Sequence, residues 1–295
     1  MFKTLFSKRS KKTISIYFGM NKVAICEYVN SQPVLIAGEL IQSDDEWSIT
    51  IKKMVNEYRL KNHNVAVVIG KDFYQKFDID KPDLEEKELQ ATLPFLIKDL
   101  VSESVFDLVV DYFDKPEQVR KNPQITAVCM PKERVLQLRN LLSDNELMLK
   151  SITTEEIATS QLFESSHLFE GSEEANILLS QQGAEILLSV VKSGQLYFSL
   201  RIRGYNDLLP TPLTEGDNPL VDGLSLEIQR ALDFINSQLQ INTIGALYLA
   251  LQCADIDLLS SKLTHYIGKQ VTPFPSDYNY DFLLAYGGFN QGVTS

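Results

Sequence analysis

One pattern of apolar-alternating segments occurs twice in the sequence, and this duplication constrains the fold more than any other feature. In the first copy, three such segments lie near residues 13–19, 22–29 and 33–41, and a stretch with helical spacing of apolar residues follows them. Alternation of apolar and polar residues is typical of β-strands, whereas an apolar residue every three or four positions is typical of a helix. After the polar stretch 164–174, the second copy again begins with three strand-like segments joined by short turns. The sequence therefore predicts two α/β units in tandem.

An additional segment interrupts the first copy. It lies between a buried-strand pattern at 64–70 and a strand-then-helix pattern at 147–163. Here the sequence predicts a helix that contains Pro94, followed by strands at 106–113 and 124–131. Proline removes a helical hydrogen bond, so we expect this helix to bend or to split at Pro94.

These patterns predict the domain organisation. A basic tail forms residues 1–12, a first domain spans 13–165, and a second domain spans 166–295. An inserted subdomain occupies about 72–152 of the first domain. Duplicated units of this kind pack as two sheets that face each other across a cleft, with strand turns pointing into it.

Composition and charge restrict the classes of protein to which the chain can belong. Of its 295 residues, 44% are hydrophobic and 23% are charged, which is typical of a globular protein. The formal net charge of −11 argues against nucleic acid as a ligand of the body of the molecule. No apolar run approaches the roughly 20 residues of a transmembrane helix, and the N-terminus lacks the apolar core of a secretory signal. We therefore expect a cytoplasmic protein.

The cysteine and histidine residues predict neither a disulfide framework nor a metal site. The three cysteines, Cys26, Cys129 and Cys253, are far apart and have no metal-ligand spacing. The three histidines lie in different segments without neighbouring metal ligands. We expect reduced thiols and no bound metal.

The N-terminal tail combines basic and apolar side chains. One interpretation is a solvated tail, and the other is a peripheral membrane-binding segment that touches anionic lipid. In the second interpretation the lipid-contacting residues are Phe2, Leu5, Phe6, Lys8 and Arg9.

Several local strings resemble the PilM branch of the actin-like ATPase superfamily, which is related to the division protein FtsA. They occur in the family's order and are spread over most of the chain: ATLPFLIKDLV (91–101), FDLVVDYFDKP (106–116), SGQLYFSLRIRGYNDL (193–208), LSLEIQRALDFINSQLQ (224–240) and YIGKQVTPFP (266–275). The resemblance implies an α/β protein of the actin-like ATPase fold, with two tandem RNase H-like domains flanking a cleft and an inserted subdomain in the first. It also implies a scaffold role in type IV pilus assembly, with recruitment to the inner membrane.

The resemblance also locates a nucleotide site, whose residues depart from the family pattern. Actin-like proteins hold ATP with two strand turns of the pattern D-x-G, in which the acid orients a metal ion or water and the glycine lets backbone N–H groups approach phosphate. At the first turn the acid position holds Tyr17, and the glycine is kept as Gly19. At the second turn these positions hold Ser180 and Gln182, and Gly183 lies one residue late.

The adenosine loop departs from the pattern as well. Where the family has a run of glycines, this chain has Ala250, Leu251, Gln252 and Cys253. Side chains at these positions oppose a close approach of the backbone to a nucleotide. With all three motifs altered, we predict a pseudo-ATPase without a cofactor, and weak binding of ATP and Mg²⁺ stays open as an alternative.

A partner site is implied by the same resemblance. In PilM-like proteins, a groove beside the inserted subdomain receives a short apolar peptide from the cytoplasmic N-terminus of a PilN-type inner-membrane protein. Apolar pockets for a peptide need no acid or metal, so loss of the ATP site would leave this binding intact. The candidate groove residues are aromatic, with core packing as the alternative interpretation: Tyr74, Phe77, Phe95, Tyr112 and Phe113.

Two other function classes stay open. One is an active ATPase or kinase of the actin and sugar-kinase superfamily, and the other is an FtsA-like membrane-associated filament protein. The adjacent acids Glu155 and Glu156 are interpreted as solvated or helix-capping residues rather than a paired-carboxylate site. The pair Gly287-Gly288 is interpreted as a helix C-terminus rather than a phosphate loop.

Overall fold

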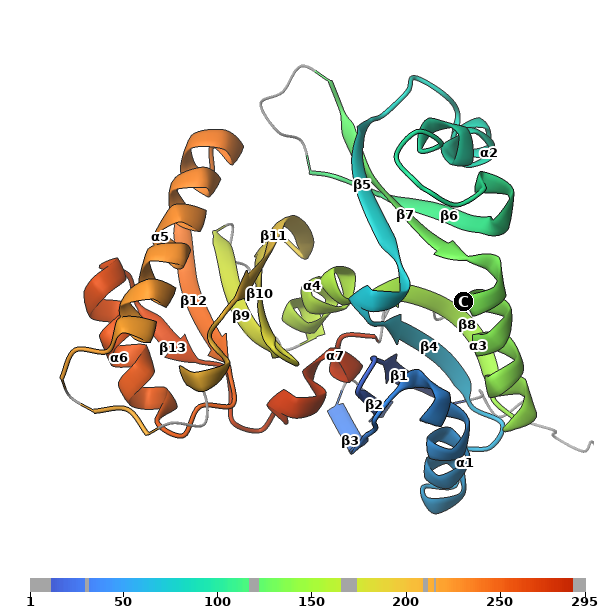
Figure 1. The fold of residues 1–295 in the computed structure, drawn as a ribbon, viewed down its shortest axis with the longest axis horizontal. Helices are drawn as coiled ribbons and strands as arrows, with labels where there is room; N and C mark the ends of the chain where they lie inside the picture. The colour runs from blue at the N-terminus through green and yellow to red at the C-terminus, as the bar shows by residue number, and fades with distance from the viewer. Residues whose placement is uncertain are drawn as a thin grey trace, which may run out of the picture.

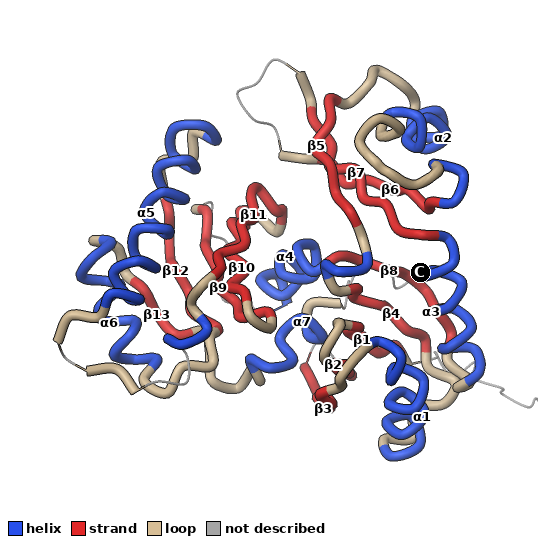
Figure 2. The backbone as a smooth tube through the Cα atoms, viewed as in Figure 1, coloured by secondary structure: helices blue, strands red, loops and turns tan. Residues whose placement is uncertain are grey.

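Two five-stranded sheets form the two halves of the molecule, and a three-stranded sheet stands on the first half (Figure 1). Helices cover the outer faces of the two large sheets, as the colouring by secondary structure shows (Figure 2). The computed structural model describes residues 12–29, 32–116, 122–165, 174–208, 212–214 and 216–288.

The first sheet has the strand order β3-β2-β1-β4-β8. β1 pairs antiparallel with β2 and parallel with β4. The strands are β1 (Thr13–Phe18), β2 (Lys22–Val29), β3 (Gln32–Leu40), β4 (Asn64–Ile69) and β8 (Met148–Thr154). Helices α1 (Trp47–Glu57) and α3 (Lys132–Asp144) bury their apolar faces against this sheet, in a cluster that includes Ile16, Trp47 and Leu138.

The second sheet repeats this arrangement in the order β11-β10-β9-β12-β13. β9 pairs antiparallel with β10 and parallel with β12, as β1 does with β2 and β4. The strands are β9 (Ala175–Gln182), β10 (Glu185–Lys192), β11 (Gln195–Arg203), β12 (Ile244–Ala250) and β13 (Val271–Pro273). Helices α5 (Pro219–Leu239) and α6 (Ile256–Ile267) pack on its outer face. The matching strand orders confirm the duplication predicted from the sequence.

Among its described residues, the insertion contains the three-stranded sheet β5-β7-β6 and the helix α2 (Glu86–Leu96). Its strands are β5 (Gln75–Asp80), β6 (Leu108–Asp114) and β7 (Gln124–Pro131). The strand β8 falls within the predicted insertion but pairs with β4, so this part of the chain belongs to the first sheet. Pro94 lies in the last turn of α2, which neither continues far beyond it nor splits there.

Two helices lie between the large sheets and join the halves. They are α4 (Glu155–Ser165) and the short α7 (Leu283–Tyr286). α4 contacts β4 and β8 of the first half and β10 and β11 of the second half, while α7 contacts α4, β1 and β2. An apolar cluster at this place combines side chains from both sheets and both helices, including Tyr17, Ala158, Leu178, Ala250 and Tyr286.

The C-terminal end of the described chain therefore returns to the first half. Gly287 follows α7 as its C-cap residue, as expected from the sequence. A Cβ atom on Gly287 would collide with the carbonyl group of Ala158 in α4, and one on Gly288 would collide with the Ser15 side chain in β1. The glycine pair thus permits close packing of backbone against the first half.

Candidate functional site

The turns of two corresponding hairpins meet where the two halves of the molecule face each other. In the β1–β2 turn, the backbone N–H of Gly19 donates to the carbonyl of Lys22 (2.9 Å). In the β9–β10 turn, Gly183 has a φ of +61°, a conformation that favours glycine. A Cβ atom on Gly183 would lie only 3.8 Å from the side-chain nitrogen of Asn21. The fold therefore brings together the two turns at which the sequence placed a degenerate nucleotide site.

The side chain of Tyr17 fills the first turn. It is 6% exposed, and a Cβ atom added to Gly19 would lie 2.7 Å from its hydroxyl oxygen. The same hydroxyl would lie 3.3 Å from a Cβ on Gly70, which follows β4. Gly19 is thus required here by the tyrosine ring that lies over it. A ring in this position leaves no room for a phosphate group against the backbone of Gly19.

Glu155, the first residue of α4, is the partner of that hydroxyl. Tyr17 Oη donates a hydrogen bond to Glu155 Oε1 (2.9 Å), and Glu155 Oε2 forms an ion pair with Arg201 Nη2 of β11. Burial, and then the negative charge of Glu155, raise the pKa of Tyr17, so the phenol stays neutral and donates. The expectation that Glu155 and Glu156 are solvated is wrong, because their side chains are each 2% exposed.

Glu156 is held by residues of the insertion. It accepts a hydrogen bond from the hydroxyl of Tyr74 and forms an ion pair with Lys76 Nζ (2.9 Å). Arg201 Nη2 lies 3.6 Å from Glu156 Oε1. Burial acts to raise the pKa of Glu156, but the charge of Lys76, the Tyr74 hydrogen bond and Arg201 outweigh it, so the pKa is lowered. Glu156 is consequently paired as an anion.

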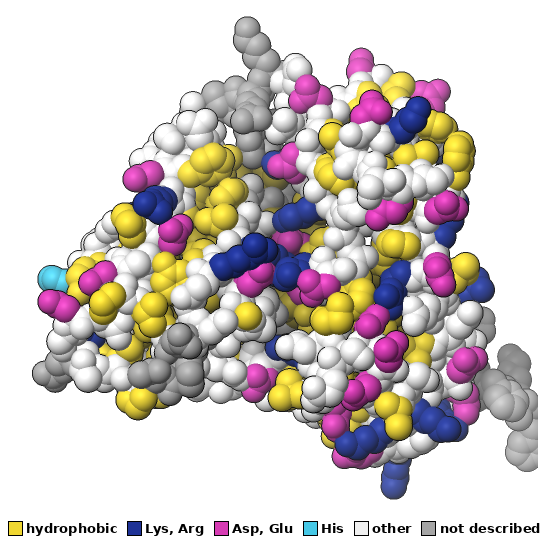
Figure 3. Space-filling model, in the orientation of Figure 1, with side chains coloured by type: hydrophobic (Ala, Val, Ile, Leu, Met, Phe, Trp, Pro, Cys, Tyr) yellow, Lys and Arg dark blue, Asp and Glu magenta, His cyan; other side chains and the backbone are white. Residues whose placement is uncertain are grey.

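We call these residues the interdomain charge cluster, because they come from the first domain, its insertion and the second domain. Its members are Tyr17, Tyr74, Lys76, Glu155, Glu156 and Arg201. Around it, Glu185 of β10 pairs with Arg203 (2.7 Å) and lies 3.6 Å from Lys71. Figure 3 shows basic and acidic side chains gathered between the second sheet and the insertion.

At the second turn, no predicted position supplies a carboxylate. Ser180 is fully buried, and Gln182 Nε2 lies within 3.4 Å of its hydroxyl oxygen. The two-residue loop of this hairpin is formed by Gly183 and Ala184, since Gln182 pairs with Glu185. The glycine is therefore at the bend of the hairpin, one residue later than the D-x-G pattern requires.

The third predicted element lies beside the second turn. The backbone N–H of Gln252 donates to Gln181 Oε1 (3.0 Å), which ties the segment after β12 to β9. Leu251 is buried, and the side chain of Gln252 is exposed. The fold thus collects all of the predicted nucleotide positions in one region. The residues there do not fit a magnesium nucleotide, because a tyrosine ring fills the first turn and neither acid position holds a carboxylate.

A cavity of about 400 Å³ opens between the insertion and the first domain. Its walls come from β6, β7, α3, β8 and the start of α4. The side chains that line it are Ile69, Val109, Asp111, Tyr112, Phe113, Val128, Met130, Val135, Ile152, Thr153, Thr154 and Ile157. We call this cavity the insertion groove.

The structure separates the five aromatic residues predicted to bind a partner. Tyr112 and Phe113 line the insertion groove, and Tyr112 also packs in the cluster that contains Leu89 and Leu93 of α2. Tyr74 belongs to the interdomain charge cluster, and Phe77 packs beneath α2 with Ile97 and Leu108. Phe95 is 59% exposed on α2 and contacts the ring of Phe106.

Sequence reasoning missed the aliphatic side chains that line most of the insertion groove. They alternate along β6 and β7 with residues that pack against α2, so the strand period of two distinguishes them. In β6, Val109 and Phe113 face the groove, whereas Leu108 and Val110 pack towards α2. The sequence prediction chose the largest aromatic side chains without considering which face of each strand they occupy. It therefore selected residues on both faces of the sheet.

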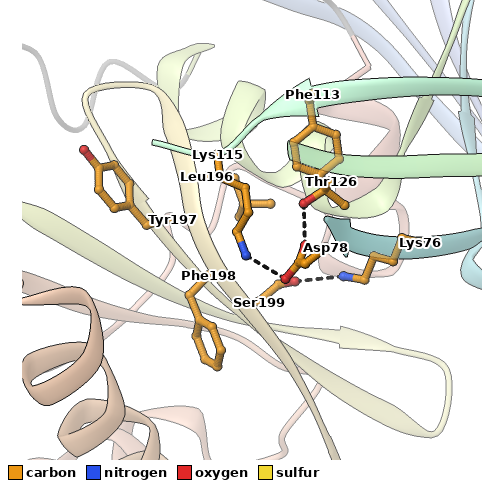
Figure 4. A pocket seen from close by; sticks show the side chains of 9 residues that line it. All are labelled: Lys76, Asp78, Phe113, Lys115, Thr126, Leu196, Tyr197, Phe198 and Ser199. Atoms are coloured by element: carbon orange, nitrogen blue, oxygen red, sulfur yellow. Dashed lines mark hydrogen bonds and ion pairs between the residues drawn. The ribbon is translucent and has the colours of Figure 1, made fainter. Parts of the chain in front are cut away.

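A second cavity, of about 230 Å³, lies between the insertion and the edge strand β11 (Figure 4). Phe113 lines both this cavity and the insertion groove. Asp78 Oδ1 accepts a hydrogen bond from Thr126 (2.7 Å), and Asp78 Oδ2 pairs with Lys115 (2.6 Å). Lys76 Nζ reaches across to Ser199 Oγ (3.0 Å), so the insertion and the second domain are in direct contact here.

The structure gives no information on the predicted lipid-contacting residues Phe2, Leu5, Phe6, Lys8 and Arg9, which lie outside the described residues. In the described part of the chain, no helix combines the length and apolar character needed to cross a membrane. Within the same residues, no group of three or more His, Cys, Asp or Glu side chains is arranged to hold a metal ion.

The fold is shared with solved structures at low sequence identity. A chain of a PilM-PilN type IV pilus biogenesis complex superposes with a TM-score of 0.69 at 16% identity, covering 94% of this chain and 97% of that one. The cytoplasmic domain of EpsL, an inner membrane component of the type II secretion system of Vibrio cholerae, gives 0.56 at 14% identity, covering 97% and 96%. A Bacteroides thetaiotaomicron protein with an actin-like ATPase fold gives 0.53 at 16% identity, covering 97% and 99%.

These similarities show that the chain has the actin-like ATPase fold, as the sequence predicted. No protein-family model matches the chain, and no curated protein matches it either.

The hydrogen bond of Tyr17 predicts a measurable contribution to stability. Tyr17→Phe removes the donor to a buried carboxylate, and we expect the free energy of unfolding to fall by about 2 kcal/mol. Urea unfolding at pH 7, followed by circular dichroism, measures this loss. Tyr197→Phe, at a partly exposed tyrosine of β11, is the matched control and should lie within about 0.5 kcal/mol of wild type. Equal stability of Tyr17→Phe and wild type would contradict the prediction.

The lowered pKa of Glu156 predicts that its contribution to stability depends on pH. A carboxylate whose pKa is lower in the folded than in the unfolded protein stabilises the fold above its ordinary value of 4.5, and this contribution disappears as the pH falls through the folded-state pKa. We expect Glu156→Gln to lower the free energy of unfolding by about 3 kcal/mol at pH 7. The difference from wild type should shrink steadily below pH 4.5.

The measurement is urea unfolding of both proteins at a series of pH values from 7 downwards. Glu227→Gln removes a carboxylate from an exposed ion pair with Arg230 on α5, and should cost less than about 0.5 kcal/mol at every pH. A wild-type advantage over Glu156→Gln that stayed constant down to the acid limit would show that Glu156 is not paired as an anion.

Proposed function

We propose that this chain is a PilM-type cytoplasmic scaffold of type IV pilus assembly, and specifically the MshI-type protein of MSHA (mannose-sensitive haemagglutinin) pilus biogenesis. Its partner is the cytosolic N-terminal peptide of a PilN-like inner-membrane protein, which recruits it to the inner membrane. The scaffold also contacts other proteins of the assembly platform. The observation that carries this proposal is the insertion groove, an apolar cavity between the insertion and the first domain of an actin-like fold.

The chemistry of the insertion groove suits a short apolar peptide. Its volume of about 400 Å³ lies within the range of roughly 300–1,000 Å³ that is usual for ligand sites. Aliphatic side chains such as Val128, Met130 and Ile152 supply apolar walls, while Asp111 and Thr153 supply polar groups that can orient a backbone. The solved structure that superposes at a TM-score of 0.69 is itself from a complex of PilM with PilN.

We further propose that the protein is a pseudo-ATPase, used for its shape and not for catalysis. Support comes from Tyr17, which lies over the backbone of Gly19, and from the ion pair of Glu155 with Arg201, which commits the nearest carboxylate to another role. An actin-like ATPase would instead keep a free carboxylate at each turn for the metal or its water. The N-terminal tail supplies at most an additional contact with anionic lipid.

Nucleotide binding provides one test. A fluorescent ATP analogue titrated with Mg²⁺ should show no saturable binding at concentrations up to about 100 μM, which corresponds to a binding free energy weaker than about −5.5 kcal/mol. The control is the same titration without Mg²⁺. Saturable, Mg²⁺-dependent binding at micromolar concentration would overturn the pseudo-ATPase proposal and favour the alternative of an ATP-binding protein.

Peptide binding provides a test of the partner. The probe is the N-terminal cytosolic peptide of the PilN-like protein encoded nearby, measured by isothermal titration calorimetry. We expect wild type to bind, and Val109→Asp to weaken binding at least about tenfold, or about 1.4 kcal/mol, because it places a charge in an apolar wall. Val109 is 42% exposed, so the fold should tolerate this change.

Val34→Asp is the matched control for Val109→Asp. Val34 is 56% exposed on β3, which is an edge strand of the first sheet as β6 is of the insertion sheet, and it does not line the groove. It should bind the peptide as wild type does. Absence of wild-type binding at tens of micromolar peptide, or equal weakening by both substitutions, would argue against the groove as the partner site.

A further inference from the structure

The two halves of the molecule are joined in two chemically different ways. Deep in the cleft, the apolar cluster around α4 and α7 combines side chains from both sheets, such as Ala24, Leu178 and Phe274. Apolar contacts of this kind are not directional and permit small rotations of one packed layer over another. They join the halves by packing, without directional bonds.

Where β5 approaches β11, the halves are joined by directional ion pairs. Arg201 of the second domain pairs with Glu155 and lies 3.6 Å from Glu156, both at the start of α4. The guanidinium is planar and presents its N–H groups in a fixed geometry, so contact with two adjacent carboxylates defines its position. The side chains of Glu155 and Glu156 are each 2% exposed, and that of Arg201 is 17% exposed.

The carboxylates are held in place by the first domain itself. Tyr17 donates to Glu155, while Tyr74 and Lys76 hold Glu156, and all three donors come from the first domain or its insertion. The two carboxylates that bind the guanidinium are therefore already oriented by the first domain without Arg201. A preorganised receptor loses little conformational entropy on binding, which favours the arrangement with the cleft closed.

Arg201 supplies the interdomain charge cluster with a cation that faces three carboxylates, two of the first domain and one of the second. Glu155 and Glu156 face the cations Arg201 and Lys76, and Arg201 Nη1 also lies 3.7 Å from Glu185 of its own domain. Without Arg201, the side chain of Glu155 keeps the hydrogen bond from the Tyr17 hydroxyl and a longer-range electrostatic interaction with Lys22, and it loses its ion pair. Buried carboxylates without a compensating cation are unfavourable, so the first domain requires the second domain at this position.

We propose that Arg201 fixes the angle between the two domains and keeps the cleft closed without any ligand. In ATP-binding proteins of this fold the nucleotide lies between the domains. Here the ion pair of Arg201 with Glu155 connects the domains instead. The scaffold consequently has one shape, independent of nucleotide. This inference does not depend on which partner occupies the insertion groove.

The test is a distance measurement between the domains. Spin labels are placed at Ser48→Cys on α1 and Ser237→Cys on α5, both exposed, in a Cys253→Ser background. Pulsed electron–electron double resonance should give a single narrow distance distribution for this protein, with and without Mg-ATP. Arg201→Gln should broaden the distribution or add a population at longer distance.

Two further variants test whether the effect depends on the ion pair of Arg201 with Glu155. Arg203→Gln is the matched control, because Arg203 lies on the same strand, is 75% exposed and pairs with Glu185 within its own domain. It should leave the distribution unchanged. Glu155→Gln, which keeps an acceptor for Tyr17 but removes the charge that attracts Arg201, should reproduce the broadening seen with Arg201→Gln.

The two cluster variants together decide the proposal. A folded Arg201→Gln protein with the wild-type distribution overturns it. If Arg201→Gln does not fold, Glu155→Gln decides, and a wild-type distribution in that protein overturns the proposal equally. Broadening in Arg203→Gln as large as in Arg201→Gln would also overturn it, because the effect would then not depend on the buried ion pair.

Discussion

Two adjacent carboxylates, Glu155 and Glu156, are buried at the start of α4, and the arrangement of the other parts of the molecule follows from their need for partners. Burial of an anion is unfavourable unless a cation and hydrogen-bond donors compensate it. No single part of the chain supplies enough of them. The first sheet contributes Tyr17, the insertion contributes Lys76, and the second domain contributes Arg201. The junction of β8 with α4 is therefore the place where all three parts meet.

The same constraint accounts for the contents of the cleft. A tyrosine at the end of β1 reaches Glu155 only by lying over the turn at Gly19, which occupies the space beside the backbone. The glycine is necessary here because a Cβ atom would collide with that ring. A phosphate-binding turn of the D-x-G pattern and this tyrosine-filled turn thus differ at position 17, which holds Tyr17 in place of the acid.

The duplication and the actin-like fold could be predicted from the sequence because apolar alternation is a local property. The strand segments expected near 13–19 and 22–29 agree closely with β1 and β2. The burial of Glu155 and Glu156 could not be predicted, since their partners lie more than forty residues away in either direction. Acids in the first turn of a helix are usually exposed and interact with its dipole. The sequence therefore favoured solvated acids at the start of α4, and this interpretation was wrong.

Only part of the insertion groove could be predicted from the sequence, again because the contacts that define it are not local. Its existence followed from the resemblance, but its lining depends on which face of β6 and β7 turns away from α2. The alternation in β6 divides Val109 and Phe113 from Leu108 and Val110, yet both sets are apolar. Where a sheet is apolar on both faces, composition does not distinguish residues that pack in the core from residues that line a groove. The three-dimensional structure is needed to distinguish them.

The position of the groove next to the interdomain charge cluster limits how a partner can bind. Thr153, Thr154 and Ile157 line the groove, and the two carboxylates lie between them in the chain. This wall cannot move to suit an occupant without separating Glu155 from Arg201, which are joined by a buried ion pair. The groove is therefore rigid on this side, and a rigid site selects its ligand by shape and loses little entropy when it binds.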